Sequence, residues 1–194
     1  MRASLSSVWT MATATRMTAD EYYEISVEGD RTQLVEGAII VNEPKPIHGL
    51  LQVRLASAIH VWIEAGEDRG LAITPTSITL DEHNVYGPDL LWFSEERRPP
   101  DMREYPEALP NLCVEIRSPG TWRYDVEDKR RVYELRGLPE LWLVDDRAEL
   151  VLVGRRSKPD FPRFDITREL GRGDTVTSPQ LPGFELALDK LFSR

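Results

Sequence analysis

Two apolar segments that each contain an acid constrain this chain more than any other feature. The segment YGPDLLWF at residues 86–93 places Asp89 directly before four apolar residues, and NLCVEIRS at 111–118 places Glu115 inside a strand-forming run. An ionised carboxylate in apolar surroundings is costly unless it is paired, hydrogen-bonded or bound to a metal. The fold must therefore provide a partner for both acids.

The alternation of side chains predicts where these acids point. It places Asp89 on the same strand face as Leu91 and Phe93, and Glu115 on the same face as Arg117. Because consecutive strands are usually neighbours, we expect the two carboxylates to approach each other. Two close carboxylates repel unless a cation lies between them, and oxygen ligands suit Mg²⁺ or Mn²⁺ better than zinc.

A helix expected at about 125–136 aims a lysine at the same region. Its apolar stripe is formed by Val126, Val132 and Tyr133, and Lys129 falls inside that stripe. A purely structural explanation remains open, because a lysine stem can lie along apolar surface or its ammonium can pair with one of the acids.

Other charged residues have two interpretations each. Glu36, in LVEG, is either a turn acid of a hairpin or a site residue, and His48 is either a helix-capping histidine or a site residue. The arginines close to Lys129 form either a local basic rim or a solvated helix face; they are Arg123, Arg130 and Arg131.

Composition limits the class of protein. The net charge of -9 gives no global attraction for nucleic acid, which argues against a DNA-coating protein but not against a nuclease with a local basic cluster. The single cysteine, Cys113, excludes an intrachain disulfide framework and a multi-cysteine zinc site, so a cytoplasmic location is the simplest expectation. No apolar run is long enough to span a membrane.

The remaining pattern predicts one α+β domain over residues 17–194, preceded by a disordered extension at 1–16. The alternative expectation is an over-long gene start, since Met11 and Met17 are also candidate initiators. A capping box at Thr18 and Glu21 opens a short helix, a hairpin turns at Gly37, and a long helix begins near residue 47. A strand is expected at 71–80, where Pro75 suggests an edge position or a bulge. Further strands are expected at 86–93, 112–118, 140–146, 149–155, 163–170 and 174–179, with a short helix at 187–192.

Six motifs in order resemble the Uma-two family of bacterial restriction-endonuclease-like proteins. They are LVEG, the P-x-x-x-H-G before the long helix, GPDLLW, CVEIRSPGT, KRRVYELRGLPELWLVD and GDTVTSPQLPGFELALDKLF, and they run from about residue 17 to 192. The resemblance implies a member of the PD-(D/E)XK nuclease superfamily. Its expected core is a mixed β-sheet flanked by helices, the restriction-endonuclease-like core, with a metal-dependent phosphodiesterase site.

The resemblance also implies roles for individual residues. Asp89 would be the motif aspartate and Glu115 the second acid, and together with the carbonyl of Ile116 they would hold Mg²⁺ or Mn²⁺. The usual lysine position is Arg117 here, and its role passes to Lys129 on the following helix.

The chain also departs from the family pattern at the first acid. The family often has a glutamate where Gln33 stands, and Asp-Gly-Glu where this chain has Glu36, Gly37 and Ala38. These departures leave Glu36 as the candidate first acid.

The expected function is metal-assisted hydrolysis of a DNA phosphodiester. Asp89, Glu115, Lys129 and Glu36 are the catalytic candidates, and the metal lowers the pKa of a bound water. The substrate contacts expected are Arg117, Arg123, Arg130 and His48. The alternative is an inactive nuclease fold that serves as a binding or regulatory module; RNA or a small phosphodiester as substrate, and a homodimer, also stay open.

Overall fold

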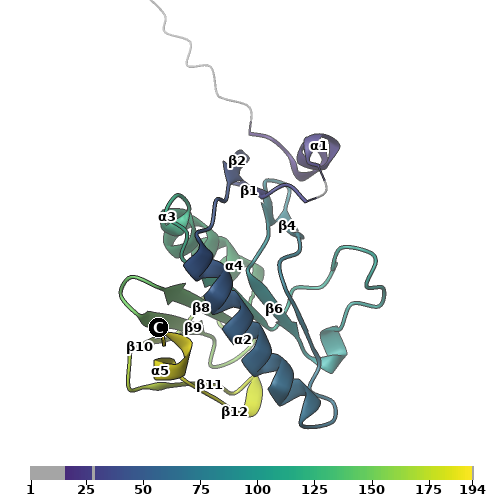
Figure 1. The fold of residues 1–194 in the computed structure, drawn as a ribbon. Coiled ribbons are helices and arrows are strands. Elements are labelled where there is room, and N and C mark those ends of the chain that lie inside the picture. Colours follow the sequence, from purple (N-terminus) through teal and green to yellow (C-terminus); the bar gives the residue numbers. More distant parts are fainter. Residues whose placement is uncertain (1–15, 28, 194) are drawn as a thin grey trace, which may run out of the picture.

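The structure is a computed structural model that describes residues 16–27 and 29–193 (Figure 1). The extension expected at 1–16 therefore lies, apart from Arg16, outside the described residues. The centre of the fold is a six-stranded mixed sheet in the order β10-β9-β8-β7-β6-β3. Its strands are β3 (Leu71–Ile73), β6 (Leu90–Phe93), β7 (Leu112–Ile116), β8 (Glu140–Asp145), β9 (Leu150–Arg155) and β10 (Ile166–Leu170).

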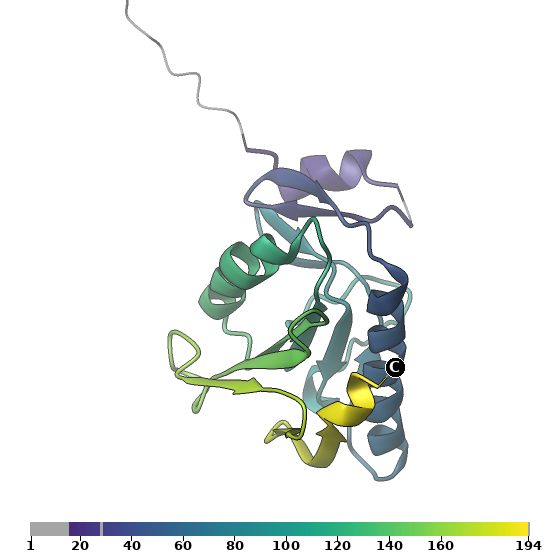
Figure 2. The same ribbon diagram turned by 60° about the vertical axis from the view of Figure 1, so that its left-hand side comes forward.

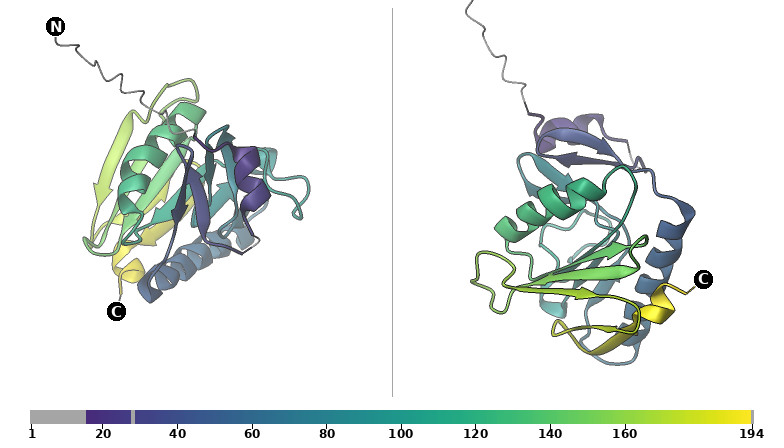
Figure 3. Two further views of the ribbon diagram at one scale, coloured as in Figure 1. Left: turned by 90° about the horizontal axis from the view of Figure 1, so that it is seen from above. Right: turned by 90° about the vertical axis from the view of Figure 1, so that its left-hand side faces the viewer.

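Two helices cover opposite faces of this sheet. The long helix α2 (Pro46–Glu64) lies on one face, and α4 (Arg130–Arg136) lies on the other (Figure 2; Figure 3, right). The parallel pair β7 and β8 is joined by the helical segment that ends in α4, whereas the other neighbours in the sheet are antiparallel. The expected α+β class, with a mixed sheet flanked by helices, is confirmed.

Strand alternation divides the core into two layers. Leu112, Val114 and Ile116 of β7 pack with α2, while Cys113 between them packs on the other side with Tyr133 of α4. All of these side chains are almost fully buried. Because both faces of β7 are covered, a charged residue in this strand has no access to bulk water and needs a partner within the protein.

A second sheet of four antiparallel strands caps one end of the fold. Its order is β2-β1-β5-β4, and its strands are β1 (Thr32–Val35), β2 (Ala38–Val41), β4 (Ile78–Asp81) and β5 (Asn84–Tyr86). Between β1 and β2 the chain turns through two left-handed residues, Glu36 and Gly37. A Cβ at Gly37 would lie 2.5 Å from the Cβ of Arg16, so this tight turn requires glycine.

The remaining elements lie at the periphery. Helix α1 (Ala19–Ile25) packs beside the four-stranded sheet and begins with the expected capping box of Thr18 and Glu21. At the opposite end of the molecule lie β11 (Thr175–Ser178), β12 (Leu181–Ala187) and α5 (Leu188–Leu191). The 3-10 turn η1 (Glu95–Arg97) lies in the proline-rich loop after β6.

Two predictions about strands were wrong, for a common reason. Residues 71–80 and 86–93 were each expected to form one strand, but each is split between the two sheets. The breaks fall at Pro75 and at Gly87-Pro88, where proline has no N–H to donate to a ladder. The second break places Asp89 at the junction of the two sheets. Strand β12 was not expected.

No helix within residues 16–27 and 29–193 has the length and apolar character needed to cross a membrane.

Replacing Ile59 tests the packing of α2 on the sheet. Ile59 is 0% exposed, so Ile59→Ala should lower the free energy of unfolding by about 2–5 kcal/mol through reduced burial and a residual cavity. Val61→Ala on the same helix is the matched control, since Val61 is 68% exposed and its truncation should change stability by less than about 0.5 kcal/mol. Urea unfolding of both variants measures the difference; equal losses of stability would contradict this packing.

Candidate active site

Asp89 lies where the chain passes from the four-stranded sheet into β6. The first pair of β6 with β7 is Leu90 with Val114, so Asp89 is next to Glu115 in the antiparallel register. One oxygen, Oδ2, accepts a 2.6 Å hydrogen bond from the backbone N–H of Ile116. The carbonyl oxygen of Asp89 accepts another, 2.8 Å long, from Gln52 of α2. The first bond fixes the carboxylate against β7, and the second fixes the backbone of Asp89 against α2.

The second carboxylate oxygen of Asp89 faces a histidine. Nε2 of His48, in the first turn of α2, lies 3.1 Å from Asp89 Oδ1, and both side chains are buried. The atoms are in contact, but their orientation does not satisfy a hydrogen bond. His48 thus lies directly beside the carboxylate that the sequence singled out.

Glu115 is held by two side chains from the following helix. Lys129 Nζ lies 3.2 Å from Glu115 Oε1, and the hydroxyl of Tyr133 donates a 2.8 Å hydrogen bond to the same oxygen. Lys129 is 2% exposed and points inward, as expected from the apolar stripe. Its Nζ also lies 2.7 Å from Oδ1 of Asp125, an acid one helical turn earlier.

The helix that carries these groups contains a π turn. The segment runs as α3 (Trp122–Tyr124), the π turn η2 (Asp125–Lys129) and α4 without a gap between them. Asp125 and Lys129 are the buried residues of the π turn and stand at its two ends. Such single π turns inside α-helices are frequent at functional sites.

One ammonium thus lies between two buried carboxylates, and this imbalance sets their ionisation. Burial raises the pKa of Glu115 to about 8, with Asp125 and Asp89 adding to the rise and Lys129 opposing it. Burial likewise raises the pKa of Asp125. For Lys129, burial disfavours the charge, but Asp125 and Glu115 outweigh it and raise the pKa of the ammonium. Lys129 therefore stays charged, and Glu115 and Asp125 retain a proton to higher pH than free acids do.

A pocket of about 520 Å³ opens beside this cluster. Asp89 and His48 line it together with Gln33 of β1 and Gln52 of α2. Glu115, Asp125 and Lys129 do not line the pocket; they are buried behind Asp89. Asp89 is thus the acid that connects the buried charge cluster to an open cavity.

The arginines expected as substrate contacts are paired with acids outside this pocket. Arg117 lies 2.5 Å from Asp145 and over the ring of Trp122. Two others form pairs within their own helix, Arg123 with Glu127 and Arg130 with Glu134. Their expected roles stay predictions.

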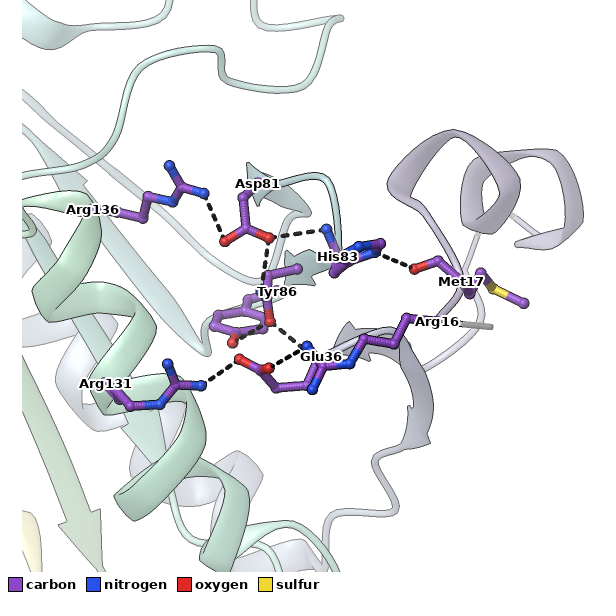
Figure 4. Close-up of polar contacts among 9 residues, drawn as sticks. Arg16, Met17, Glu36, Asp81, His83, Tyr86, Arg131 and Arg136 are labelled. Atoms are coloured by element: carbon purple, nitrogen blue, oxygen red, sulfur yellow. Dashed lines mark hydrogen bonds and ion pairs between the residues drawn. The ribbon is translucent and has the colours of Figure 1, made fainter. Parts of the chain in front are cut away.

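Glu36 forms part of a separate network (Figure 4). Its carboxylate pairs with Arg16 and with Arg131 of α4, and its backbone N–H donates to Asn84 Oδ1 at 3.0 Å. Nearby, Arg136 of α4 pairs with Asp81 at 2.8 Å. The structure does not place Glu36 in the wall of the pocket with Asp89.

Several residues of the site were not singled out from the sequence. Asp125 was treated only as the start of a helix, although its four-residue spacing from Lys129 is a signal for an ion pair. Tyr133 was counted as apolar, although a buried tyrosine hydroxyl usually finds a partner. Gln33 was noted as a departure from the family, and its Oε1 accepts a 3.2 Å hydrogen bond from Gly87 N–H at the pocket wall.

The donor chemistry fits a hard divalent cation held by few protein ligands. Within the described part of the chain, no three side chains of His, Cys, Asp or Glu form a ready metal cluster. Mg²⁺ does not need one, because it keeps several waters and is typically bound by one or two carboxylates and substrate phosphates. Asp89 and Glu115, which are adjacent in the register of β6 and β7, are the carboxylates available.

The comparisons with known proteins agree with this fold. The model of the Uma2 family, described as "putative restriction endonuclease", matches residues 19–189. The chain therefore belongs to the Uma2 family.

Among solved structures, a similar one is a protein from Anabaena variabilis ATCC 29413, titled "putative nuclease belonging to DUF820". It is 22% identical, with a TM-score of 0.75 over 91% of this chain and 98% of the other. At this identity the likeness shows the fold. No curated protein matches the chain.

Removing one carboxylate of the cluster should change the ionisation of the other. Because the charge of Asp125 contributes to the raised pKa of Glu115, Asp125→Asn should shift the pKa of Glu115 from about 8 toward its ordinary value. Titration of ¹³C-labelled glutamate carboxyls by NMR measures this, with Glu115→Gln to assign the signal. Glu127→Gln, on the exposed side of the helix, is the control and should leave the signal unchanged.

Removing the ammonium should make stability strongly dependent on pH. The pKa of Glu115 is higher in the folded state than in the unfolded state, so the folded state binds more protons than the unfolded state between these two pKa values. The free energy of unfolding therefore falls as pH rises from about 4.5 to about 8. Lys129→Met leaves two buried carboxylates without a cation, which steepens this loss. We expect the free energy of unfolding of Lys129→Met to be about 3–5 kcal/mol lower than that of the wild type at pH 8, with a smaller difference at pH 5. Lys158→Met, at an exposed position, is the control. A deficit independent of pH would contradict the pairing.

Proposed function

We propose that this protein is a divalent-metal-dependent nuclease that hydrolyses DNA phosphodiester bonds at the pocket beside Asp89. One observation carries the proposal: Asp89 lines a 520 Å³ pocket and is adjacent, in the register of β6 and β7, to Glu115, which pairs with a buried lysine from the following helix. Membership of the Uma2 family supports it. Magnesium, DNA as substrate and a cytoplasmic location are parts of the proposal.

Asp89, Glu115 and the carbonyl of Ile116 are the groups that would hold Mg²⁺ or Mn²⁺. When bound, the metal supplies Lewis-acid stabilisation of phosphate charge and lowers the pKa of a water. The hydrogen bond from Ile116 N–H fixes one oxygen of Asp89 and so orients the other toward the pocket and His48.

Lys129 has an electrostatic and positioning role in this proposal. Its ammonium stays protonated between Glu115 and Asp125, so it cannot take a proton from water at neutral pH. It can balance the surplus of negative charge that an attacking oxygen and a phosphate bring to two carboxylates. Tyr133 holds Glu115 in the orientation that faces this ammonium. Arg117 stays protonated at any working pH, which excludes it as a base.

The alternative is a nuclease fold that binds nucleic acid without cleaving it. It is favoured by Gln33, an uncharged residue in the pocket wall where the family often has a glutamate. Isothermal calorimetry with Mg²⁺ and Mn²⁺, in the presence of DNA, separates the two. Absence of metal binding supports the inactive module, and metal binding that disappears in Asp89→Asn supports the nuclease.

Two substitutions test the mechanism directly. Asp89→Asn keeps an oxygen that can accept from Ile116 N–H but removes the negative charge, so the fold should persist while cleavage falls by at least about 100-fold. Lys129→Ala should lower the cleavage rate of the folded protein by a comparable factor. The assay measures Mg²⁺- or Mn²⁺-dependent cleavage of duplex DNA, single-stranded DNA, RNA and a small phosphodiester.

Lys158→Ala, which removes an exposed amine from the loop between β9 and β10, is the control for this assay and should cleave like the wild type. Circular dichroism checks that each variant is folded. Full activity of folded Lys129→Ala would remove this residue from the mechanism.

A further inference from the structure

The mouth of the pocket carries two basic residues that the sequence did not single out. Arg31, just before β1, and Lys45, at the N-cap of α2, both line the pocket and are exposed. Neither has an ion pair with another described residue, whereas Arg117, Arg123 and Arg130 do. Free positive charge therefore lies at the pocket entrance, in a protein whose net charge is -9.

The first turn of α2 adds a second attraction for anions. This helix of 19 residues has no side-chain cap at Lys45 and no acidic residue in its first turn, so its N-terminal partial charge is not neutralised locally. Gly49, in that turn, also lines the pocket, and a Cβ at this position would meet nothing within 4 Å. The turn has space beside it but few free backbone donors, because Pro46 has no N–H and the N–H of His48 donates to the Lys45 carbonyl at 2.9 Å.

Buried polar atoms of the wall are without hydrogen-bond partners among the described residues. They are Nε2 of His48, whose residue is 4% exposed, and Oδ1 of Asn42. Nε2 of His48 already faces Asp89 Oδ1 at 3.1 Å, and an amide oxygen accepts rather than donates a hydrogen bond, so neither atom marks an anion site; the positive charge at the mouth comes from Arg31 and Lys45. Asp30 also lines the mouth, but its carboxylate accepts hydrogen bonds from Val27 N–H and from the N–H and hydroxyl of Thr32. Its charge is thus directed onto its own loop.

We propose that Arg31 and Lys45, beside the first turn of α2, bind a phosphate of the nucleic acid strand that flanks the phosphate at Asp89. This assignment rests on the proposed function for the identity of the ligand, but it concerns binding rather than hydrolysis. It places the strand across the mouth of the pocket and gives a sequence-independent contact, because phosphates carry no base identity.

Fluorescence anisotropy with a labelled single-stranded DNA, in EDTA and across a range of salt concentrations, tests the assignment. The variant Arg31→Ala/Lys45→Ala should bind at least tenfold more weakly at low salt. For this variant, the slope of log affinity against log salt concentration should be less steep by about 0.7 for each phosphate that it no longer neutralises. The matched control is Lys158→Ala/Arg163→Ala, which removes the same two charges from exposed positions outside the pocket and should bind like the wild type.

The outcomes separate this assignment from the nuclease proposal. Weaker binding by Arg31→Ala/Lys45→Ala alone supports the phosphate site, even if the wild type cleaves no substrate with any metal. Equal binding by both double variants, with cleavage intact, overturns the phosphate site and leaves the nuclease proposal standing. Equal weakening in both would also overturn it, because the effect would then reflect total charge.

Discussion

The fold is organised around one buried ammonium that lies between two carboxylates. Lys129 contacts Glu115 of the central strand and Asp125 of its own helix, and all three side chains are almost fully removed from water. Breaking such a cluster by removing one partner leaves an uncompensated buried charge, which is costly. The helix from Trp122 to Arg136 and strand β7 are therefore held to each other by charge as well as by apolar packing.

The junction between the two sheets explains why the pocket lies where it does. Asp89 follows a break that proline imposes, and its carboxylate is fixed by β7 on one side and approached by His48 of α2 on the other. The four-stranded sheet contributes Gln33 to the same wall. Three separate parts of the chain thus meet at one pocket, which is the arrangement expected of a binding site rather than of a core position.

Local patterns predicted much of this arrangement and failed where distant segments meet. The apolar stripe around Lys129 was enough to aim its side chain inward, and the neighbour rule for consecutive strands was enough to bring Asp89 beside Glu115. The pocket mouth was not predictable in the same way. Arg31 and Lys45 lie at the pocket mouth because the β1–β2 pairing and the start of α2 bring them there. The periodicity of apolar residues within a single element does not predict such an approach of separate elements. The split of residues 86–93 was signalled by Pro88 but was not recognised.

An ion pair of Glu36 connects the β1–β2 hairpin to the helix that follows Lys129. The β1–β2 turn is joined through Glu36 to Arg131, on the helix that begins directly after Lys129 (Figure 4). Strand β1 of the same hairpin contributes Gln33 to the pocket wall. The hairpin therefore contacts the cavity through Gln33 and the lysine-bearing helix through Glu36. One ion pair thus connects the segment that forms part of the cavity wall to the helix that follows Lys129.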